Sequence, residues 1–391
     1  MRFFDATRRD GRIFGVLLVA KLACRTTTGL RFASRIRLKI RAVACDISSR
    51  DRFNSMTREN IINDFLARSG WEGARRAPLA GDASFRRYER VYLNDRQAVL
   101  MDAPPEKEDV RPFIHIGEHL KSGGFSTPEI YARDVKNGLL LLEDLGDALY
   151  TPILSKSPER EEALYLAAAD VLVELYAQAE KTRYEGFNPY DEALLMRELG
   201  LFGEWFLPSV MDKQTAVKHA MDYNALWKKL LKKLPALRKV LVLRDYHADN
   251  LIWLPRREGI KRVGLLDFQD GVIGSPAYDV VSFLEDARRD VRETTVKRVL
   301  AHYLEQTCLG QEEFMAAYAL LGAQRNCKIV GIFVRLMARD GKRQYLSYLP
   351  RVWRHLERDL SHPLLAPLRD WMDKVIRPEW RGAIDKLQAT A

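Results

Sequence analysis

Two carboxylates and one amide in the second half of the chain have the types and spacing that phosphate chemistry uses. An apolar run, Val240–Leu243, is closely followed by Asp245, and Asn250 comes five residues later. A second apolar run, Val263–Leu266, leads directly into Asp267. We expect two short strands joined by a tight turn, with the three side chains gathered at the strand ends. Mg²⁺ usually takes one or two carboxylates together with phosphate oxygens, so this stretch predicts a site for Mg²⁺ and a nucleotide phosphate.

The surrounding segments predict an α+β fold that would position this site. Residues 57–69 have the periodicity of an amphipathic helix, and short alternating runs between residues 77 and 142 predict an antiparallel sheet with one helix, over 110–121. The run Leu139–Leu142 is typical of a buried strand. Beyond Gly146 the pattern is mainly helical, with helices expected over residues 157–179, 191–206, 213–233 and 318–336. We therefore expect a smaller sheet-containing part at residues 56–146 and a larger helical part at 147–391.

Residues 1–55 form a basic extension that is expected to be disordered or to lie outside the fold. They carry thirteen Lys and Arg against four Asp and Glu, whereas residues 56–391 carry fifty against forty-nine. The net charge of +10 therefore comes almost wholly from the extension. Met56 directly precedes the first expected helix, so we expect it to be the natural start. The nearly neutral body argues against a nucleic-acid-binding protein.

Composition also bears on the compartment. No apolar run approaches the roughly 18 residues that a membrane span needs, so no membrane partner is expected. The four cysteines have neither metal-ligand spacing nor the density of a disulfide framework. These features favour a reducing, cytoplasmic location. No pattern in the sequence indicates an oligomeric state.

The spacing of the acidic residues resembles the catalytic and metal-binding segments of kinases. Protein kinases have an Asp followed by four residues and Asn, and then an Asp-Phe-Gly segment. Here Asp245 and Asn250 match the first, and Asp267-Phe268-Gln269 the second. His247, two residues after Asp245, makes the chain more similar to the aminoglycoside-phosphotransferase and choline-kinase branch. The resemblance implies a protein-kinase-like two-lobe fold, with a small antiparallel-sheet N-lobe and a larger, mainly helical C-lobe.

The same resemblance implies a role for each of these residues. Asp245 would orient the acceptor hydroxyl and take its proton, while Asn250 and Asp267 would hold Mg²⁺ on the phosphates of ATP. His247 would brace the loop, and Asp279 would anchor the loop backbone from the following helix. Positioning and charge neutralisation supply most of the catalysis in phosphoryl transfer. A strand-end Asp taken alone is more often a turn or cap residue, and the combination is what favours a kinase.

A hinge between the two lobes is expected where the buried leucine strand ends. In kinase-like folds the adenine ring meets backbone donors and acceptors at this place. The residues that would do so here are Leu142, Glu143, Asp144 and Leu145. The alternative is an ordinary strand followed by a turn.

The phosphate-binding part departs from the kinase pattern. The strand expected over residues 98–102 lacks the lysine that most kinases pair with the α- and β-phosphates. Ser84, Arg86 and Arg87 lie where the phosphate-covering loop is expected, and a guanidinium there could take over part of the charge neutralisation. Adjacent strand residues point to opposite faces, so a solvated strand face is the alternative for the arginines.

Longer motifs narrow the resemblance to one group of kinases. They are GDASFRRY at 81–88, MDAPP at 101–105, RDYH at 244–247 with Asn250, and LDFQD at 266–270. Over roughly residues 57–380 the chain is similar to bacterial anomeric kinases of N-acetylmuramate and N-acetylglucosamine, which serve in cell-wall recycling. The resemblance implies ATP-dependent phosphorylation of the anomeric hydroxyl of these amino sugars, giving the sugar 1-phosphate for peptidoglycan recycling. The missing lysine is then a trait of the family.

Two other functions remain open at this point. One is another small-molecule phosphotransferase, such as an aminoglycoside kinase, and the other is a nucleotide-binding pseudokinase. A strongly acidic substrate pocket would favour a cationic aminoglycoside, whereas a basic residue near the sugar side chain would favour muramate. The intact Asp245, Asn250 and Asp267 argue against a pseudokinase.

Acceptor contacts are expected on the helical lobe, facing Asp245. The segment 194–207 carries Glu198, Glu204 and Trp205 among apolar residues, and carboxylates and aromatic rings both suit sugars. Arg325 interrupts an apolar helix and could meet a lactyl carboxylate through a charge-assisted pair. The alternatives are a core position for Trp205, solvent exposure for the glutamates, and a buried structural network or an exposed helix face for Arg325.

Overall fold

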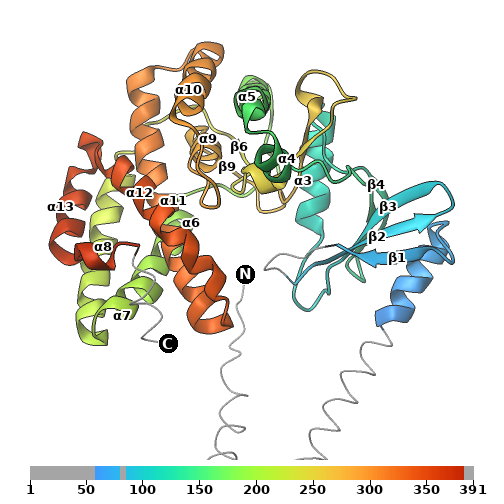
Figure 1. Ribbon diagram of the computed structural model, residues 1–391, viewed down its shortest axis with the longest axis horizontal. Helices are drawn as coiled ribbons and strands as arrows, with labels where there is room; N and C mark the ends of the chain where they lie inside the picture. The colour runs from blue at the N-terminus through green and yellow to red at the C-terminus, as the bar shows by residue number, and fades with distance from the viewer. Residues whose placement is uncertain (1–57, 80–84, 383–391) are drawn as a thin grey trace, which may run out of the picture. The chain divides into compact units, whose positions relative to one another are not determined.

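The computed structural model describes residues 58–79 and 85–382 (Figure 1). The chain divides into two compact units. The first includes a helix over residues 58–68, as expected, with Ile62, Phe65 and Leu66 buried. The expected extension 1–55, the predicted start at Met56 and the candidate residue Ser84 all lie outside the described residues. The predicted boundary at residue 146 stays a prediction.

A five-stranded sheet forms the N-terminal part of the fold, in the order β1-β2-β3-β5-β4. The strands are β1 (Arg75–Pro78), β2 (Arg87–Leu93), β3 (Arg96–Asp102), β4 (Ile130–Asp134) and β5 (Leu139–Leu142). Helix α3 (Arg111–Ser122) follows β3. The four leucines of β5 are all buried, because this strand pairs antiparallel with β3 on one side and with β4 on the other. The predicted antiparallel sheet with one helix is confirmed, and β4 is an addition that its charged sequence did not reveal.

The two apolar runs before Asp245 and Asp267 form strands, as predicted, but they are not joined by a tight turn. The first is β6 (Val240–Val242), which pairs antiparallel with β9 (Val272–Gly274). The second is β8 (Val263–Leu265), which pairs antiparallel with β7 (Leu251–Trp253). The expectation was wrong because β7 intervenes and takes β8 as its own partner. The site is therefore built at the ends of two separate two-stranded sheets.

Helices make up most of the remaining chain. They are α4 (Tyr150–Lys156), α5 (Glu161–Gln178), α6 (Glu192–Leu201), α7 (Leu207–Val210), α8 (Lys213–Leu231), α9 (Ala277–Leu284), α10 (Glu293–Thr307), α11 (Gln311–Asp340), α12 (Leu349–Leu360) and α13 (Ala366–Val375). A π-helical segment, η2 (Phe202–Phe206), continues α6 where one α-helix was expected. None of the helices in the described ranges has both the length and the apolar character that a membrane crossing requires.

Helix α11 is the long central helix of this part, with α6 and α12 beside it (Figure 1). It packs closely on the junction of α6 and η2. A Cβ atom added at Gly331 would lie 2.4 Å from the backbone carbon of Leu201, so only glycine allows this approach. The close packing brings polar residues of α11 against those of α6, near the loop that carries Asp245.

Candidate active site

The loop after β6 is held by a carboxylate from α9. Asp279 Oδ2 accepts the amide hydrogen of Leu243 at 2.6 Å, and Oδ1 accepts that of Arg244 at 2.9 Å. Arg244 has φ of +68°, a left-handed conformation that is costly for a residue with a side chain. Burial raises the pKa of Asp279 to about 7, against the two backbone donors, which lower it. These bonds fix the direction in which the chain presents Asp245.

Asn250 and His247 lock the other end of the loop. The Asn250 amide nitrogen donates to the backbone oxygen of Asp245 at 2.9 Å and lies 3.4 Å from His247 Nε2. Arg288 approaches the same ring nitrogen at 3.2 Å. Amide and guanidinium nitrogens only donate, so His247 Nε2 accepts, and burial keeps the pKa of this histidine below its usual value. The contacts use the nitrogen of the Asn250 amide and leave Oδ1 for another ligand.

Asp267 follows β8 and lies in the field of Asp245. Its φ is +55°, and its Oδ1 accepts a hydrogen bond from Gln269 at 2.8 Å. Burial first, and then the charge of Asp245, raise the pKa of Asp267. A divalent cation between these groups would relieve the repulsion that raises this pKa.

The donor set fits a magnesium ion that is shared with a nucleotide. Asp267 and the oxygen of Asn250 are hard ligands of the type Mg²⁺ prefers, with phosphate oxygens and water completing the octahedron. No group of three or more His, Cys, Asp or Glu that could hold a metal occurs in residues 58–79 and 85–382. Asp267 and the oxygen of Asn250 would fill only part of the coordination shell of Mg²⁺, and phosphates and water would supply the other ligands.

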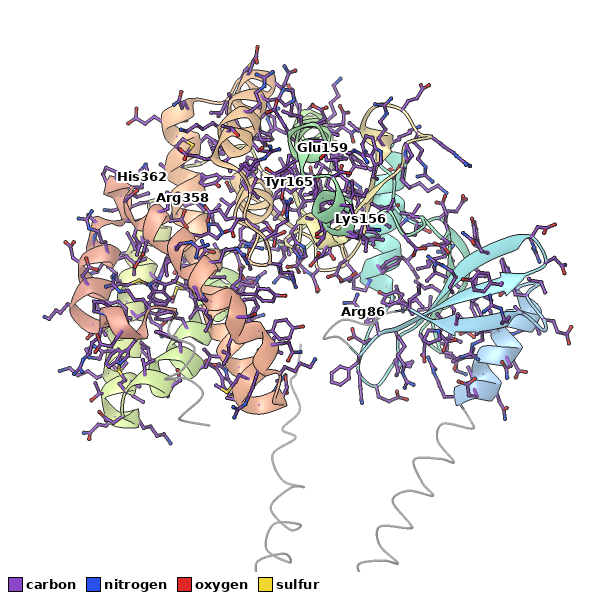
Figure 2. The ribbon with its side chains drawn as sticks, in the orientation of Figure 1. Arg86, Lys156, Glu159, Tyr165, Arg358 and His362 are labelled. Atoms are coloured by element: carbon purple, nitrogen blue, oxygen red, sulfur yellow. The ribbon has the colours of Figure 1, made fainter. Side chains whose placement is uncertain are left out.

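Arg86 and Arg87 take opposite faces of the chain entering β2. Arg86 projects from the sheet toward the helical part (Figure 2), and its guanidinium lies 3.7 Å from Asp267 Oδ1 and 4.0 Å from Glu108 Oε2. Arg87 is exposed. The structure thus brings one of the two arginines to the predicted metal carboxylate, and the alternation of side chains in a strand leaves the other in solvent.

The predicted hinge begins where β5 ends. Leu142 is buried and pairs with Val99 of β3 and Ile130 of β4. The Glu143 amide donates to the backbone oxygen of Glu129 at 2.7 Å, and its carboxylate pairs with Arg257 at 2.5 Å. The amide and the side chain of Glu143 are thus already used by the protein.

The next two hinge residues, Asp144 and Leu145, differ in the contacts that their side chains make. Asp144 pairs with Arg90 at 2.5 Å, and its Oδ1 accepts from the Gly146 amide at 2.8 Å. The Leu145 side chain packs beside Gly264 of β8, where an added Cβ would lie 3.1 Å from Leu145 Cδ1. Neither the Asp144 amide nor the Leu145 amide forms a hydrogen bond within the part of the chain that the structure describes. Both remain as backbone donors for a nucleotide base.

Glu198 is the hub of a buried polar cluster, and its side chain is only 7% exposed. Oε1 accepts from the guanidinium of Arg244 and from Lys328 Nζ, the latter at 2.8 Å. Oε2 accepts from the Tyr190 hydroxyl at 2.6 Å and from Gln324 at 3.1 Å. Burial would raise the pKa of Glu198, but Lys328 and Arg244 outweigh it and lower the pKa to about 2. With four donors on two oxygens, this carboxylate orders its neighbours and has little capacity left for a sugar hydroxyl.

The other predicted acceptor residues are not gathered at this cluster. Arg325 is 4% exposed and donates to the backbone oxygen of Glu285 at 3.4 Å, which agrees with the alternative of a buried structural network. Glu204 is exposed, and Trp205 is partly buried against the core. Arg325 still acts on Asp245 through its charge, which lowers the pKa of that carboxyl.

Lys328 is a functional candidate that the sequence did not reveal. It lies on α11, one turn after Gln324, so both residues face Glu198. Its charge is foremost among those that hold the pKa of Asp245 below its usual value against the effect of burial. The i, i+4 spacing from Gln324 was a signal in the sequence, but nothing in it showed that Glu198 would lie opposite.

A small sheet joined to a helical lobe, with Asp245, Asn250 and Asp267 at strand ends, defines a kinase-like phosphotransferase. The chain belongs to the phosphotransferase enzyme family, whose family model matches residues 75–318. It is 36% identical over 361 residues to the N-acetylmuramate/N-acetylglucosamine kinase of Caulobacter vibrioides, covering 84% of this chain and 99% of that one. It is also 36% identical over 326 residues to the protein of the same name from Pseudomonas aeruginosa, covering 79% and 92%.

Solved structures agree on the fold. The choline kinase LicA from Streptococcus pneumoniae matches with a TM-score of 0.54 at 15% identity, covering 79% of this chain and 99% of that one. The predicted kinase-like fold and small-molecule kinase class are therefore confirmed.

Proposed function

We propose that this protein transfers the γ-phosphoryl group of ATP to the anomeric hydroxyl of N-acetylmuramate and N-acetylglucosamine, giving the sugar 1-phosphate for peptidoglycan recycling. The observation that carries this proposal is the similarity, over nearly the whole of the Caulobacter chain, to a kinase named for these two sugars. We also propose a cytoplasmic location for this ATP-dependent enzyme.

In the proposed reaction Asp245 acts as the base. Its carboxylate takes the proton of the acceptor hydroxyl while the hydroxyl oxygen bonds to the γ-phosphorus. The bond from that phosphorus to the oxygen shared with the β-phosphate breaks, and ADP leaves with the electron pair. Asp279 serves this step by holding the loop backbone at Leu243 and Arg244.

The phosphates would be held by residues from both lobes. Asp267 and the oxygen of Asn250 would bind Mg²⁺, which supplies neutralisation of the phosphate charge when bound. Arg86, close to Asp267, would take the place of the missing strand lysine. Ser84 would lie in the phosphate-covering turn, and Leu142 to Leu145 would meet the adenine ring. Arg87 is exposed, so it would contribute less to phosphate binding than Arg86.

The sugar acceptor would bind on the helical lobe, facing Asp245. Glu204 and Trp205 remain candidates for contact with the sugar. Glu198 and Arg325 would support the site without contacting the sugar, since both side chains are buried and bonded to other protein groups.

A kinase assay over N-acetylmuramate, N-acetylglucosamine and a panel of aminoglycosides, with phosphorus NMR of the product, tests the proposal. We expect phosphate on the anomeric oxygen of the two amino sugars and no transfer to aminoglycosides. Asp245→Asn should remove most of the transfer while nucleotide binding persists. A phosphate on another hydroxyl would reject the anomeric reaction, and ATP binding without any transfer would favour a pseudokinase.

A further inference from the structure

Lys328 lies at the edge of the Glu198 cluster with its side chain 12% exposed. Its ammonium group donates to Glu198 Oε1 at 2.8 Å and lies 3.4 Å from the Tyr278 hydroxyl. An ammonium has three donors, so a third N–H remains beyond these two contacts. A nearly buried lysine with a spare donor is expensive to keep unless something binds it.

Two cations share one carboxylate beside Lys328. Glu198 pairs with both Arg244 and Lys328, and the charge of Asp245 also acts on this lysine. Arg244 uses both terminal nitrogens of its guanidinium, because Nη1 also donates to the Asp270 backbone oxygen at 3.2 Å, while its Nε is buried. Lys328 carries its spare donor on a side chain that is partly exposed.

The position of Lys328 relative to Asp245 links its spare N–H donor to the acceptor. The charged groups whose fields reach Asp245 are Arg244 and His247 from its own loop, Arg325 and Lys328 from α11, Asp267 after β8, and Asp279 from α9. Of the cations from α11, Arg325 is buried and bonded to a backbone oxygen. Lys328 shares the Glu198 carboxylate with Arg244, the residue that precedes Asp245, so side-chain contacts link this lysine to the loop that carries Asp245.

We propose that Lys328 binds the acidic substituent of the acceptor and so favours a carboxylate-bearing amino sugar over its neutral counterpart. This inference rests on the proposed function and deepens it. An acceptor carboxylate near Asp245 would be repelled by that residue's negative charge, and a hydrogen bond from Lys328 would offset the repulsion. The Glu198 carboxylate accepts a hydrogen bond from the ammonium group, so the lysine is ordered before the substrate arrives.

The test compares kcat/KM for N-acetylmuramate with kcat/KM for N-acetylglucosamine in one set of variants. A charge-assisted hydrogen bond corresponds to roughly a tenfold to hundredfold effect. Lys328→Met should therefore lower the ratio of the two constants by at least tenfold, and Lys328→Arg should restore part of it. Lys228→Met, at an exposed position on α8, is the matched control and should leave the ratio as in the wild type.

The outcomes separate this inference from the proposed function. A fall in the ratio of the two kcat/KM values that Lys328→Arg partly reverses supports the role of Lys328 in specificity. An equal loss on both sugars would show that Lys328 only maintains the site, and would overturn the specificity role. Folding is checked by the thermal unfolding of each variant and by its binding of ADP. A wild-type enzyme that phosphorylates neither sugar would refute the proposed function itself.

Discussion

The substitution Glu198→Gln tests whether the buried cluster stabilises the protein through charge. The pKa of this carboxyl falls from its ordinary 4.5 to about 2 in the folded protein, where burial is outweighed by Lys328 and Arg244. One pKa unit corresponds to about 1.36 kcal/mol, so the ionised form contributes roughly 3 kcal/mol to the free energy of unfolding near neutral pH. Glutamine has nearly the same shape but cannot ionise, and it should lose that contribution.

The sign of the pH dependence follows from the lowered pKa. A carboxyl whose folded pKa is depressed stabilises the protein above its unfolded pKa, and that contribution is lost as the pH falls toward the folded value. The difference between wild type and Glu198→Gln should be about 3 kcal/mol at pH 7 and about half of that near pH 3. Below about pH 2 the wild-type carboxyl is itself protonated and the difference should vanish.

Urea unfolding between pH 3 and pH 7, followed by circular dichroism, measures this difference. Glu204→Gln is a suitable control, because Glu204 belongs to the neighbouring η2 segment but is exposed. We expect the control to change the free energy of unfolding by less than about 0.5 kcal/mol. A Glu198→Gln effect that stays constant from pH 7 to pH 3 would refute the electrostatic origin, since lost packing does not titrate.

Three further predictions, two of them with a comparison variant, test other parts of the structure. Asp267→Ala should abolish Mg²⁺-dependent transfer, measured as activity against MgCl₂ at fixed ATP; persisting metal dependence would contradict the ligand assignment. Arg86→Ala should raise the KM for ATP by roughly tenfold and more than Arg87→Ala does, and equal effects would contradict the placement of the two side chains. Gly331→Ala would put a methyl group 2.4 Å from the α6 backbone and should cost about 1–3 kcal/mol. Gly200→Ala, where the nearest atom is 3.4 Å away, should be neutral or stabilising by thermal unfolding.

Local patterns were sufficient for much of the fold. The leucine run 139–142, the amphipathic segment 58–68 and the two strands before Asp245 and Asp267 all occur as expected, because each is decided by the periodicity of its own residues. Strand pairing was not decided in that way. The β6 strand pairs with β9 and the β8 strand pairs with β7, and the periodicity within a strand does not show which partner it takes.

The residues predicted to bind the acceptor show even more clearly that local patterns do not decide long-range contacts. Glu198 and Arg325 were selected for their residue type, but Glu198 uses both oxygens within a buried network and Arg325 is buried with a bond to a backbone oxygen. Lys328 was overlooked, although it has the spare donor. Residue type and spacing indicate what a side chain is able to bind, but burial decides whether that ability is already used.

The sequence by itself determined the chemistry of this protein: an aspartate, an asparagine and a second aspartate at kinase spacing, set in a chain of the phosphotransferase family. These signals lie within short segments, where spacing along the chain fixes geometry. Only the tertiary structure decided how charge is arranged around Asp245. Glu198, Arg244, Tyr278 and Lys328 come from α6, the loop after β6, α9 and α11, and they meet because a glycine lets α11 lie close against α6. Contacts between residues so far apart in the chain depend on how helices pack, which no local pattern encodes.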